Sequence, residues 1–426
     1  MSASTLVQKI IRRASGRADA TPGAVVVMRV DLAMATDLSG SLWRPKLEEL
    51  RAPIWDPTKI VLVNDHFAPG YDPYSASFLQ GLRRFAADYG IANFHDMEGI
   101  CHVILAEKGY LRPGIFVAGG DSHTPMAGAF GCLAMGFGAT DMVAIAATGE
   151  TWLQVPATML IQLDGKLDTG VTAKDLMLML CGRLGMNNAA TVVQYRGAAV
   201  EAMPMSERLV LTNMAAELGC DSGIIEPDET TLTYLREHAG VIDEDALSWV
   251  SDDNAEYASI EVFDAKSVEP QVAAPHSPEK SAAASEFAGV RIDQAYIGAC
   301  VGAKIEDLRM AAAALNGKKI APGTRLLVAP ASRATTTEAA GDGTLQTLLE
   351  AGATLLPTGC GACAGLGAGV LAQGDVCIST TNRNFKGRMG HKDSLVYLAS
   401  PYTVAASAVH GHIADPRDFL CSELDA

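Results

Sequence analysis

Short apolar runs alternate along the chain with longer stretches in which apolar residues recur every three or four positions. The short runs predict buried strands, and the longer stretches predict amphipathic helices. Alternation of this kind is typical of an α/β protein built in layers. The predicted strands lie at residues 24–28, 60–63, 114–118, 159–163, 294–297 and 324–329, and the predicted helices at residues 75–89, 173–184, 305–315 and 344–351.

Changes in composition divide the chain into blocks. Residues 264–285 are rich in Pro, Ala, Ser and Glu, which on composition alone indicates a linker. A weaker boundary falls at residues 154–156. The length of 426 residues fits two or three domains with large cores, because 49% of the residues are apolar. We predict three α/β domains, over residues 1–155, 156–288 and 289–426.

Net charge and cysteine usage narrow the class of protein. The formal net charge of −16 disfavours nucleic acid and anionic membranes as partners, so an anionic substrate would need a local group of cations. The chain has no run of about 20 apolar residues, so we expect no transmembrane helix. Residues 1–19 are basic but lack the apolar core of a signal peptide, and they predict an N-terminal helix instead. Nine scattered cysteines fit free thiols in a reducing compartment, and we expect a cytoplasmic protein.

Three cysteines carry the most specific chemistry in the sequence. Cys360 and Cys363 stand in a glycine-rich loop at residues 358–365, and Cys300 precedes them. Glycine lets backbone approach a bulky ligand closely, and grouped thiolates favour zinc or an iron–sulfur cluster. Three protein ligands would leave one metal position open, which favours Lewis-acid chemistry over electron transfer. A redox dithiol, or two small core residues, would also explain the spacing of Cys360 and Cys363.

Two Asp–His pairs follow predicted strands directly. Asp65-His66 comes after one apolar run, Asp121 and His123 come after another, and His102 lies near the start of a strand or helix. An α/β sheet usually places its ligand-binding groups after the carboxyl ends of strands, and an aspartate can fix a histidine's tautomer or raise its pKa. A single Asp–His pair is more often a cap or a turn. Two such pairs in this position favour a site.

Two further groups are weaker. Arg383 and Arg388 flank a turn in the basic loop at residues 380–388 and could both reach a carboxylate. A solvated surface loop could have the same sequence. Asn213 and Glu217 are four residues apart, which places them on one face of a predicted helix. Ordinary surface polarity would explain that pair as well.

Taken in order, four stretches resemble the motifs of the aconitase superfamily, most closely those of the large subunits of 3-isopropylmalate dehydratase and related hydro-lyases. They are residues 120–124, Cys300 with residues 305–309, residues 358–363 and residues 382–390. The resemblance extends from about residue 26 to residue 416, in the family's order. It implies an aconitase-like three-domain α/β/α architecture that lacks the swivelling fourth domain. It also implies that residues 264–285 are ordered as they cross between domains.

The resemblance assigns roles position by position. It implies that Cys300, Cys360 and Cys363 hold three irons of a 4Fe–4S cluster and leave the fourth iron for the substrate's hydroxyl and carboxylate and for water. Active-site groups that support proton transfer are implied at Asp65, His66, His102, Asp121, His123 and Glu217. Substrate-binding or cluster-side groups are implied at Ser122, Asn213, Arg383 and Arg388.

The implied activity is the dehydration and rehydration of a malate-type hydroxy dicarboxylic acid. We expect the large subunit of a 3-isopropylmalate dehydratase of leucine biosynthesis first. A hydratase of maleate, citraconate or dimethylmaleate, or a homoaconitase-type large subunit, would use the same chemistry. Relatives take their catalytic serine from the swivelling domain, so we expect a small-subunit partner that carries it.

Two departures from the family pattern affect the substrate more than the cluster. Val301-Gly302 follows Cys300 where relatives usually have Thr-Asn, which removes polar groups beside the cluster. Residues 33–43 match the family poorly, so neither Asp37 nor Ser39 is given a role. Two other classes stay open: a cluster-free RNA-binding relative, against which the retained cysteines and the acidic charge count, and a zinc hydrolase built on the same three cysteines.

Overall fold

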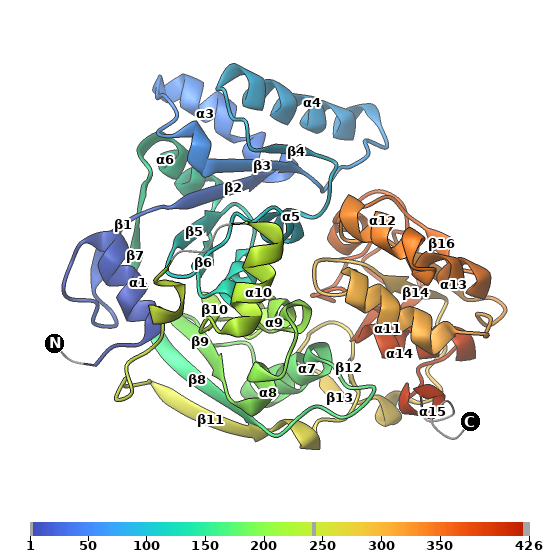
Figure 1. Cartoon of the computed structure of the whole chain (residues 1–426). Helices are drawn as coiled ribbons and strands as arrows, with labels where there is room; N and C mark the ends of the chain where they lie inside the picture. The colour runs from blue at the N-terminus through green and yellow to red at the C-terminus, as the bar shows by residue number, and fades with distance from the viewer. Residues whose placement is uncertain (1–2, 241–243, 421–426) are drawn as a thin grey trace.

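The computed structural model describes residues 3–240 and 244–420, which form three layered α/β units (Figure 1). The first unit, blue to teal, lies at the top of the view, the second, green to yellow, lies below it, and the third, orange to red, lies to the right. Met34, Met159 and Ala295 come from the three units in turn and belong to one cluster of buried apolar residues. The three units therefore share a continuous core.

The first unit is built on a parallel sheet with the strand order β4-β3-β2-β5-β6. Strands β2, β3 and β5 are buried along their whole length, as expected for a parallel sheet with helices on both faces. The sheet strands are β2 (Leu32–Thr36), β3 (Ile60–Asn64), β4 (Phe94–Asp96), β5 (Phe116–Gly119) and β6 (Leu133–Gly136). The helices are α1 (Leu6–Ser15), α2 (Asp37–Gly40), α3 (Trp43–Leu50), α4 (Pro73–Asp88), α5 (Cys101–Glu107) and α6 (Ala139–Thr148). A separate antiparallel pair joins β1 (Val25–Arg29) to β7 (Glu150–Gln154).

The second unit has a parallel sheet in the order β10-β9-β8-β11. Its strands are β8 (Ala157–Asp164), β9 (Thr191–Arg196), β10 (Ser222–Ile225) and β11 (Ser259–Asp264). Its helices are α7 (Ala173–Leu184), α8 (Ala198–Glu201), α9 (Met205–Asn213) and α10 (Glu229–His238). Helix α7 begins where the side chain of Thr172 caps it and Asp175 completes the capping box.

The third unit has a sheet in the order β13-β12-β18-β17-β14-β15-β16, in which β12 and β13 run antiparallel and the rest run parallel. Its strands are β12 (Gln271–Ala273), β13 (Ser281–Ala283), β14 (Gln294–Ile297), β15 (Arg325–Val328), β16 (Thr354–Leu355), β17 (Val376–Ser379) and β18 (Leu395–Ala399). Its helices are α11 (Ile305–Leu315), α12 (Arg333–Gly341), α13 (Thr344–Ala351), α14 (Pro401–His410) and α15 (Arg417–Leu420).

Most predicted elements are present, with small shifts at their ends. The strands predicted at residues 60–63 and 294–297 correspond to β3 and β14, and the helices predicted at residues 173–184 and 305–315 are α7 and α11. The linker interpretation of residues 264–285 is wrong, because that segment contains β12, β13 and short 3-10 turns. The order that the family resemblance implied for this segment is confirmed.

Two further expectations concern the chain as a whole. The three parallel-stranded sheets follow the three predicted blocks, except that β12 and β13, from the end of the second block, belong to the third sheet, where β12 pairs with β18. The division into domains at residues 155 and 288 stays a prediction. None of the described helices combines the length and the apolar character needed to cross a membrane.

Candidate active site

Four parallel strands bring the candidate residues to one place. Asp65 follows the end of β3, and Asp121 follows the end of β5 by two residues. Cys300 comes three residues after β14, and Asn382 comes three residues after β17. The carboxyl ends of parallel strands are where α/β sheets hold ligands. Two sheets contribute, so the site lies between the first and third units.

One buried cavity is lined by most of the predicted residues. These are the three cysteines, the acid–base candidates and one arginine: Cys300, Cys360, Cys363, Asp65, His66, His102, Asp121, His123 and Arg388. Asn382 lines the cavity too, although it was not among the predicted site residues. The remaining predicted residues, Ser122, Asn213, Glu217 and Arg383, hydrogen-bond to neighbours in or beside this cavity.

The glycine before Cys360 is required by close backbone packing. The amide N–H of Cys360 donates to the carbonyl of Asp65 at 2.8 Å, which ties the cysteine loop to the end of β3. Gly359 has a φ of +148°, and a Cβ at this position would lie 2.6 Å from the same carbonyl oxygen. A side chain would therefore push the loop away from Asp65.

The amides of two asparagines surround the sulfur of Cys300. Nδ2 of Asn213 lies 3.1 Å from this Sγ, and Nδ2 of Asn382 lies 3.7 Å from it. Asn382 also donates to Oδ1 of Asn213, so the two side chains orient each other. N–H groups directed at a cysteine sulfur stabilise its thiolate and tune any metal bound to it.

The thiols are held in a buried and cationic setting. Burial raises the pKa of Cys300 to about 12, and nearby Cys363 adds to the rise. The neighbouring thiol of Cys360 and the guanidinium of Arg388 both lower the pKa of Cys363. A thiol of lowered pKa beside an arginine is prepared to act as a thiolate ligand.

Asp65 and His66 form a pair that a third residue fixes in place. Nδ1 of His66 is 2.7 Å from Oδ1 of Asp65, and the other oxygen of Asp65 accepts the amide N–H of Cys101 at 2.8 Å. Asp37 is fully buried, and its carboxylate accepts the amide N–H groups of His66 and Phe67 at 3.1 and 2.7 Å. Although burial opposes a charge on the imidazole, the two carboxylates raise the pKa of His66 well above its usual value.

A chain of four groups crosses the site from His102 in α5 to Glu217, which follows the 3-10 turn Met214–Ala216 after α9. Nε2 of His102 is 2.8 Å from Oδ1 of Asp121, and Nε2 of His123 is 3.1 Å from Oε1 of Glu217. Burial alone would raise the pKa of Asp121, but hydrogen bonds from both histidines bring it well below its usual value. Burial likewise opposes protonation of His123, but the charge of Glu217 raises its pKa to about 9. At neutral pH the site therefore holds Asp121 as a carboxylate and His123 as an imidazolium.

The basic loop after β17 turns inward. Nε of Arg383 donates to Oε1 of Glu217 at 2.7 Å, and its Nη1 donates to Oγ of Ser122 at 2.8 Å. The guanidinium of Arg388 lies beside the thiols of Cys363 and Cys360. The surface-loop alternative for this segment is therefore wrong.

Several buried polar atoms of the site have no hydrogen-bond partner within residues 3–240 and 244–420. They are Nδ1 of His102, Oε2 of Glu217 and Nε of Arg388. Buried polar atoms in proteins are nearly always paired, and exceptions cluster where a ligand belongs. Three lining thiols, N–H donors at a thiol sulfur and unpaired polar atoms together fit a bound metal cluster with a polar ligand beside it.

The structure corrects one prediction about the site. Asn213 and Glu217 do not share one helix face, because α9 ends at Asn213 and a 3-10 turn, Met214–Ala216, separates them. Both side chains are fully buried, so the surface-polarity alternative is wrong as well.

Sequence reasoning missed two residues of the site. Asp37 was left without a role, yet it holds the backbone of His66. Asn382 contacts the sulfur of Cys300. A signal for Asn382 was present, since it stands immediately before Arg383 in the basic loop.

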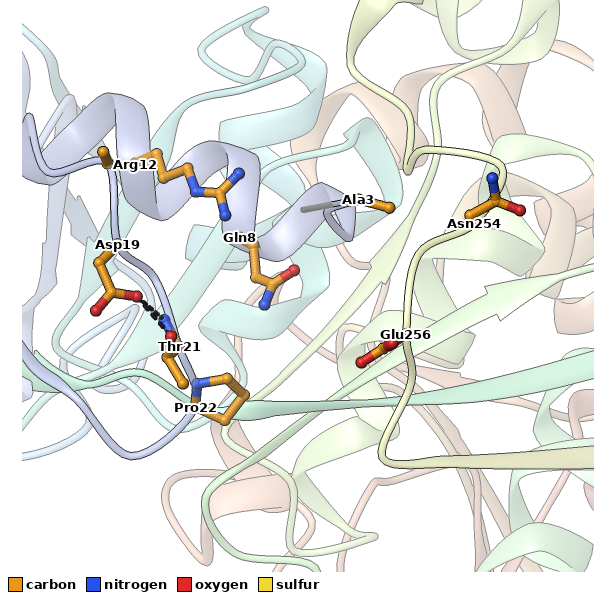
Figure 2. Close-up of a pocket in the computed structure, with 9 residues that line it drawn as sticks. Ala3, Gln8, Arg12, Asp19, Thr21, Pro22, Asn254 and Glu256 are labelled. Carbon is orange, nitrogen blue, oxygen red and sulfur yellow. Dashed lines mark hydrogen bonds between the residues drawn. The ribbon is translucent and has the colours of Figure 1, made fainter. Parts of the chain in front are cut away.

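A second pocket lies apart from these groups, near the N-terminus (Figure 2). Gln8 and Arg12 of α1 face Asn254 and Glu256 across it. Its lining shares no residue with the cavity around the cysteines. The chemistry-bearing residues thus identify the interior cavity as the candidate active site.

Comparisons with known proteins agree with this geometry. Residues 9–411 match the Aconitase family (aconitate hydratase). A 3-isopropylmalate dehydratase large subunit from Methanopyrus kandleri is 43% identical over 419 residues, which cover 98% of this chain and 99% of that protein. A methanogen homoaconitase large subunit from Methanocaldococcus jannaschii is 43% identical over 422 residues, covering 97% of this chain and all of that protein.

A solved structure extends the likeness to the fold. The holo-form of aconitase X from Thermococcus kodakaraensis superposes with a TM-score of 0.53 at 13% identity, covering 91% of this chain and 93% of that one. Identity at that level speaks for the fold alone. The match over residues 9–411 and the relatives of 43% identity settle the family. The chain belongs to the aconitase family.

Proposed function

We propose that the chain is the large, cluster-bearing subunit of a 4Fe–4S-dependent hydro-lyase that dehydrates and rehydrates a malate-type hydroxy dicarboxylic acid. The observation that carries this proposal is a single cavity that combines Cys300, Cys360 and Cys363 with paired carboxylates, imidazoles and a guanidinium. Removal of water from a hydroxy acid needs assistance for the departing hydroxyl, which a metal can give, together with proton-handling groups and cations for the carboxylates.

The three thiols are the residues that would hold the cluster. Cys300 receives N–H groups from two asparagines, and Arg388 lies beside the other two thiols. When bound, such a cluster supplies a Lewis acid at an iron that no thiolate occupies. The zinc alternative uses the same thiols, and iron and sulfide analysis separates the two.

The two histidines bonded to Asp121 and Glu217 make different contacts. A carboxylate can only accept, so Nε2 of His102 donates to Asp121, and its Nδ1 has no hydrogen-bond partner among the described residues. His123 is an imidazolium at neutral pH because Glu217 stabilises its charge. His123 can therefore give a proton to a departing hydroxyl, and the unpaired Nδ1 of His102 is left to bond to the substrate.

Arginines supply the positive charge that a dicarboxylate needs in an acidic protein. Arg383 is held at its base by Glu217 and Ser122, which orients its guanidinium. Arg388 is half-buried, and its Nε has no hydrogen-bond partner among the described residues. Guanidinium groups bind carboxylates through paired N–H donors and stabilise the extra negative charge that forms when the neighbouring C–H proton leaves.

A small subunit is the proposed partner. The curated relatives that match the chain along its whole length are named large subunits. We infer that a second polypeptide with a swivelling domain covers the cavity, excludes water and adds the catalytic base.

Two substrates have support from relatives. A 3-isopropylmalate dehydratase large subunit and a homoaconitase large subunit are each 43% identical to the chain. We place 3-isopropylmalate first and the homoaconitase reaction second.

The test combines metal analysis with a substrate panel. The chain is purified without oxygen, its iron and acid-labile sulfide are measured, and it is mixed with the small subunit encoded in the same genome. The panel contains 3-isopropylmalate, homoaconitate and citraconate, and turnover is followed by the absorbance of the unsaturated acid. We expect about four irons per chain and turnover only in the two-subunit complex. A colourless protein with zinc, or an iron-loaded complex inactive on the whole panel, would contradict the proposal.

A further inference from the structure

Two lysines are buried among the described residues, and only one of them has a carboxylate partner. Nζ of Lys304 lies 2.7 Å from Oδ2 of Asp307. Lys174 is 1% exposed and forms no ion pair within residues 3–240 and 244–420. Its Nζ donates instead to the carbonyls of Thr381 at 2.7 Å and Thr380 at 3.3 Å. A buried ammonium without a partner charge is costly, so its retention needs a reason.

The position of Lys174 in its helix adds to that cost. It is the second residue of α7, whose N-terminus carries a partial positive charge that disfavours a cation. The next residue, Asp175, does not compensate it. One oxygen of Asp175 accepts from Thr172 at 2.9 Å, and the other accepts from the amide of Gln271 at 2.9 Å.

The negative groups that act on Lys174 belong to the active site. Burial lowers the pKa of Lys174 to about 8, and the groups that oppose this effect are Glu217, Cys300, Cys363 and Cys181. Two of them are proposed cluster ligands, and Glu217 is the partner of His123. The charge of Lys174 is thus directed at the thiolate side of the cavity.

The two carbonyls that bind Lys174 lie at the start of the basic loop at residues 380–388. Thr380 and Thr381 immediately precede Asn382, which contacts Cys300, and Arg383, which is held by Glu217. Lys174 comes from the second unit, whereas these carbonyls follow β17 of the third. Its ammonium therefore connects two units at the point where the loop begins.

We propose that Lys174 is a positioning residue that sets the electrostatic potential of the cluster site, because its ammonium holds the loop that carries Asn382 and Arg383 and its charge offsets the thiolates of Cys300 and Cys363. This inference rests on the proposed function. Adding an electron to a cluster adds negative charge, so a fixed cation nearby favours the reduced form. Lys174 thereby raises the reduction potential of the bound cluster.

The test uses the full chain, reconstituted with iron and sulfide without oxygen. Lys174→Met removes the charge and keeps the length of the side chain, and Lys174→Arg keeps the charge. The matched control replaces the other buried lysine together with its partner, Lys304→Met with Asp307→Asn, so that no net charge is lost. Iron content, the Tm and the midpoint potential of the cluster are measured for each protein, with the potential followed by electron paramagnetic resonance.

We expect Lys174→Met to bind the cluster with a more negative midpoint potential than the wild-type chain. In Lys174→Arg the midpoint potential should lie close to the wild-type value. The control should lower the Tm and leave the midpoint potential unchanged. Loss of the cluster in Lys174→Met with retention in Lys174→Arg would also support the inference. An unchanged potential in Lys174→Met overturns it while the proposed function stands. Loss of the cluster in both Lys174 variants also overturns it, because shape rather than charge would then be required. A wild-type chain that takes up no iron removes the proposed function and this inference together.

Discussion

Replacing Glu217 with glutamine removes the charge that sets the protonation state of His123. Nε2 of His123 and Oε1 of Glu217 are 3.1 Å apart, and both side chains are buried. At an effective dielectric constant of about 20, two unit charges at this distance attract by about 5 kcal/mol. Burial of the imidazolium offsets part of that attraction. The pKa of His123 still rises from 6.5 to about 9, so the folded protein favours the protonated form by about 3 kcal/mol. Glu217→Gln keeps the side-chain shape, so we expect the pKa of His123 to fall by about two units or more.

The same pair links stability to pH. His123 has a pKa of about 9 when folded and an ordinary value of 6.5 when unfolded. Between these values the folded state binds more protons than the unfolded state, so stability falls as pH rises. The contribution is fully present below pH 6.5 and is lost as pH rises through about 9. In Glu217→Gln we expect this dependence to shrink.

The titration can be read by nuclear magnetic resonance of protein labelled with ¹³C at its histidines. A His123→Gln variant assigns the signal, and denaturant unfolding between pH 6 and 10 measures the stability. Glu207→Gln is the matched control, since Glu207 is a buried carboxylate that accepts from the amide of Ala173. A His123 signal that still titrates near 9 in Glu217→Gln would refute the reasoning. An equal fall of the His123 pKa in Glu207→Gln would refute it as well.

Three further substitutions test other parts of the site. Cys363→Ser should abolish the intact cluster, whereas Cys377→Ser should retain it, because Cys377 is buried within β17 and does not line the cavity. Iron and sulfide are measured in both variants, and cluster loss in Cys377→Ser would contradict the proposed set of three cysteine ligands. Arg383→Lys should leave the iron content unchanged and lower kcat/KM of the two-subunit complex by about 100-fold, because lysine cannot form the paired hydrogen bonds of a guanidinium. Near-wild-type kinetics would count against carboxylate binding by Arg383. Asp37→Asn should lower the free energy of unfolding by about 1–3 kcal/mol in denaturant titrations, since the Asp37 carboxylate accepts two buried backbone N–H groups. An unchanged free energy of unfolding would show that these bonds contribute nothing to stability.

Local pattern was enough to predict where the chemistry lies along the chain. The apolar run that became β3 predicted a strand, and the polar residues directly after it predicted a strand-end site at Asp65. The helix of residues 173–184 was visible from its periodicity. Composition misled at residues 264–285, because small residues there serve tight pairing in β12 and β13 rather than flexibility. The helix expected to carry both Asn213 and Glu217 also ends early, at Asn213. The failure at residues 264–285 came where a segment owes its order to distant strands.

The role of Asp37 shows why the rest was out of reach. β2 and β3 are adjacent parallel strands, and Thr36 stands opposite Val63 in their register. That pairing brings Asp37, the residue after Thr36, beside the backbone that follows β3, where it accepts the amide of His66. The register is fixed by burial of the whole sheet, and no local pattern around residue 37 contains it. A carboxylate that positions the Asp65–His66 pair through the backbone leaves no motif of its own, so it becomes visible only when the neighbouring strand is known.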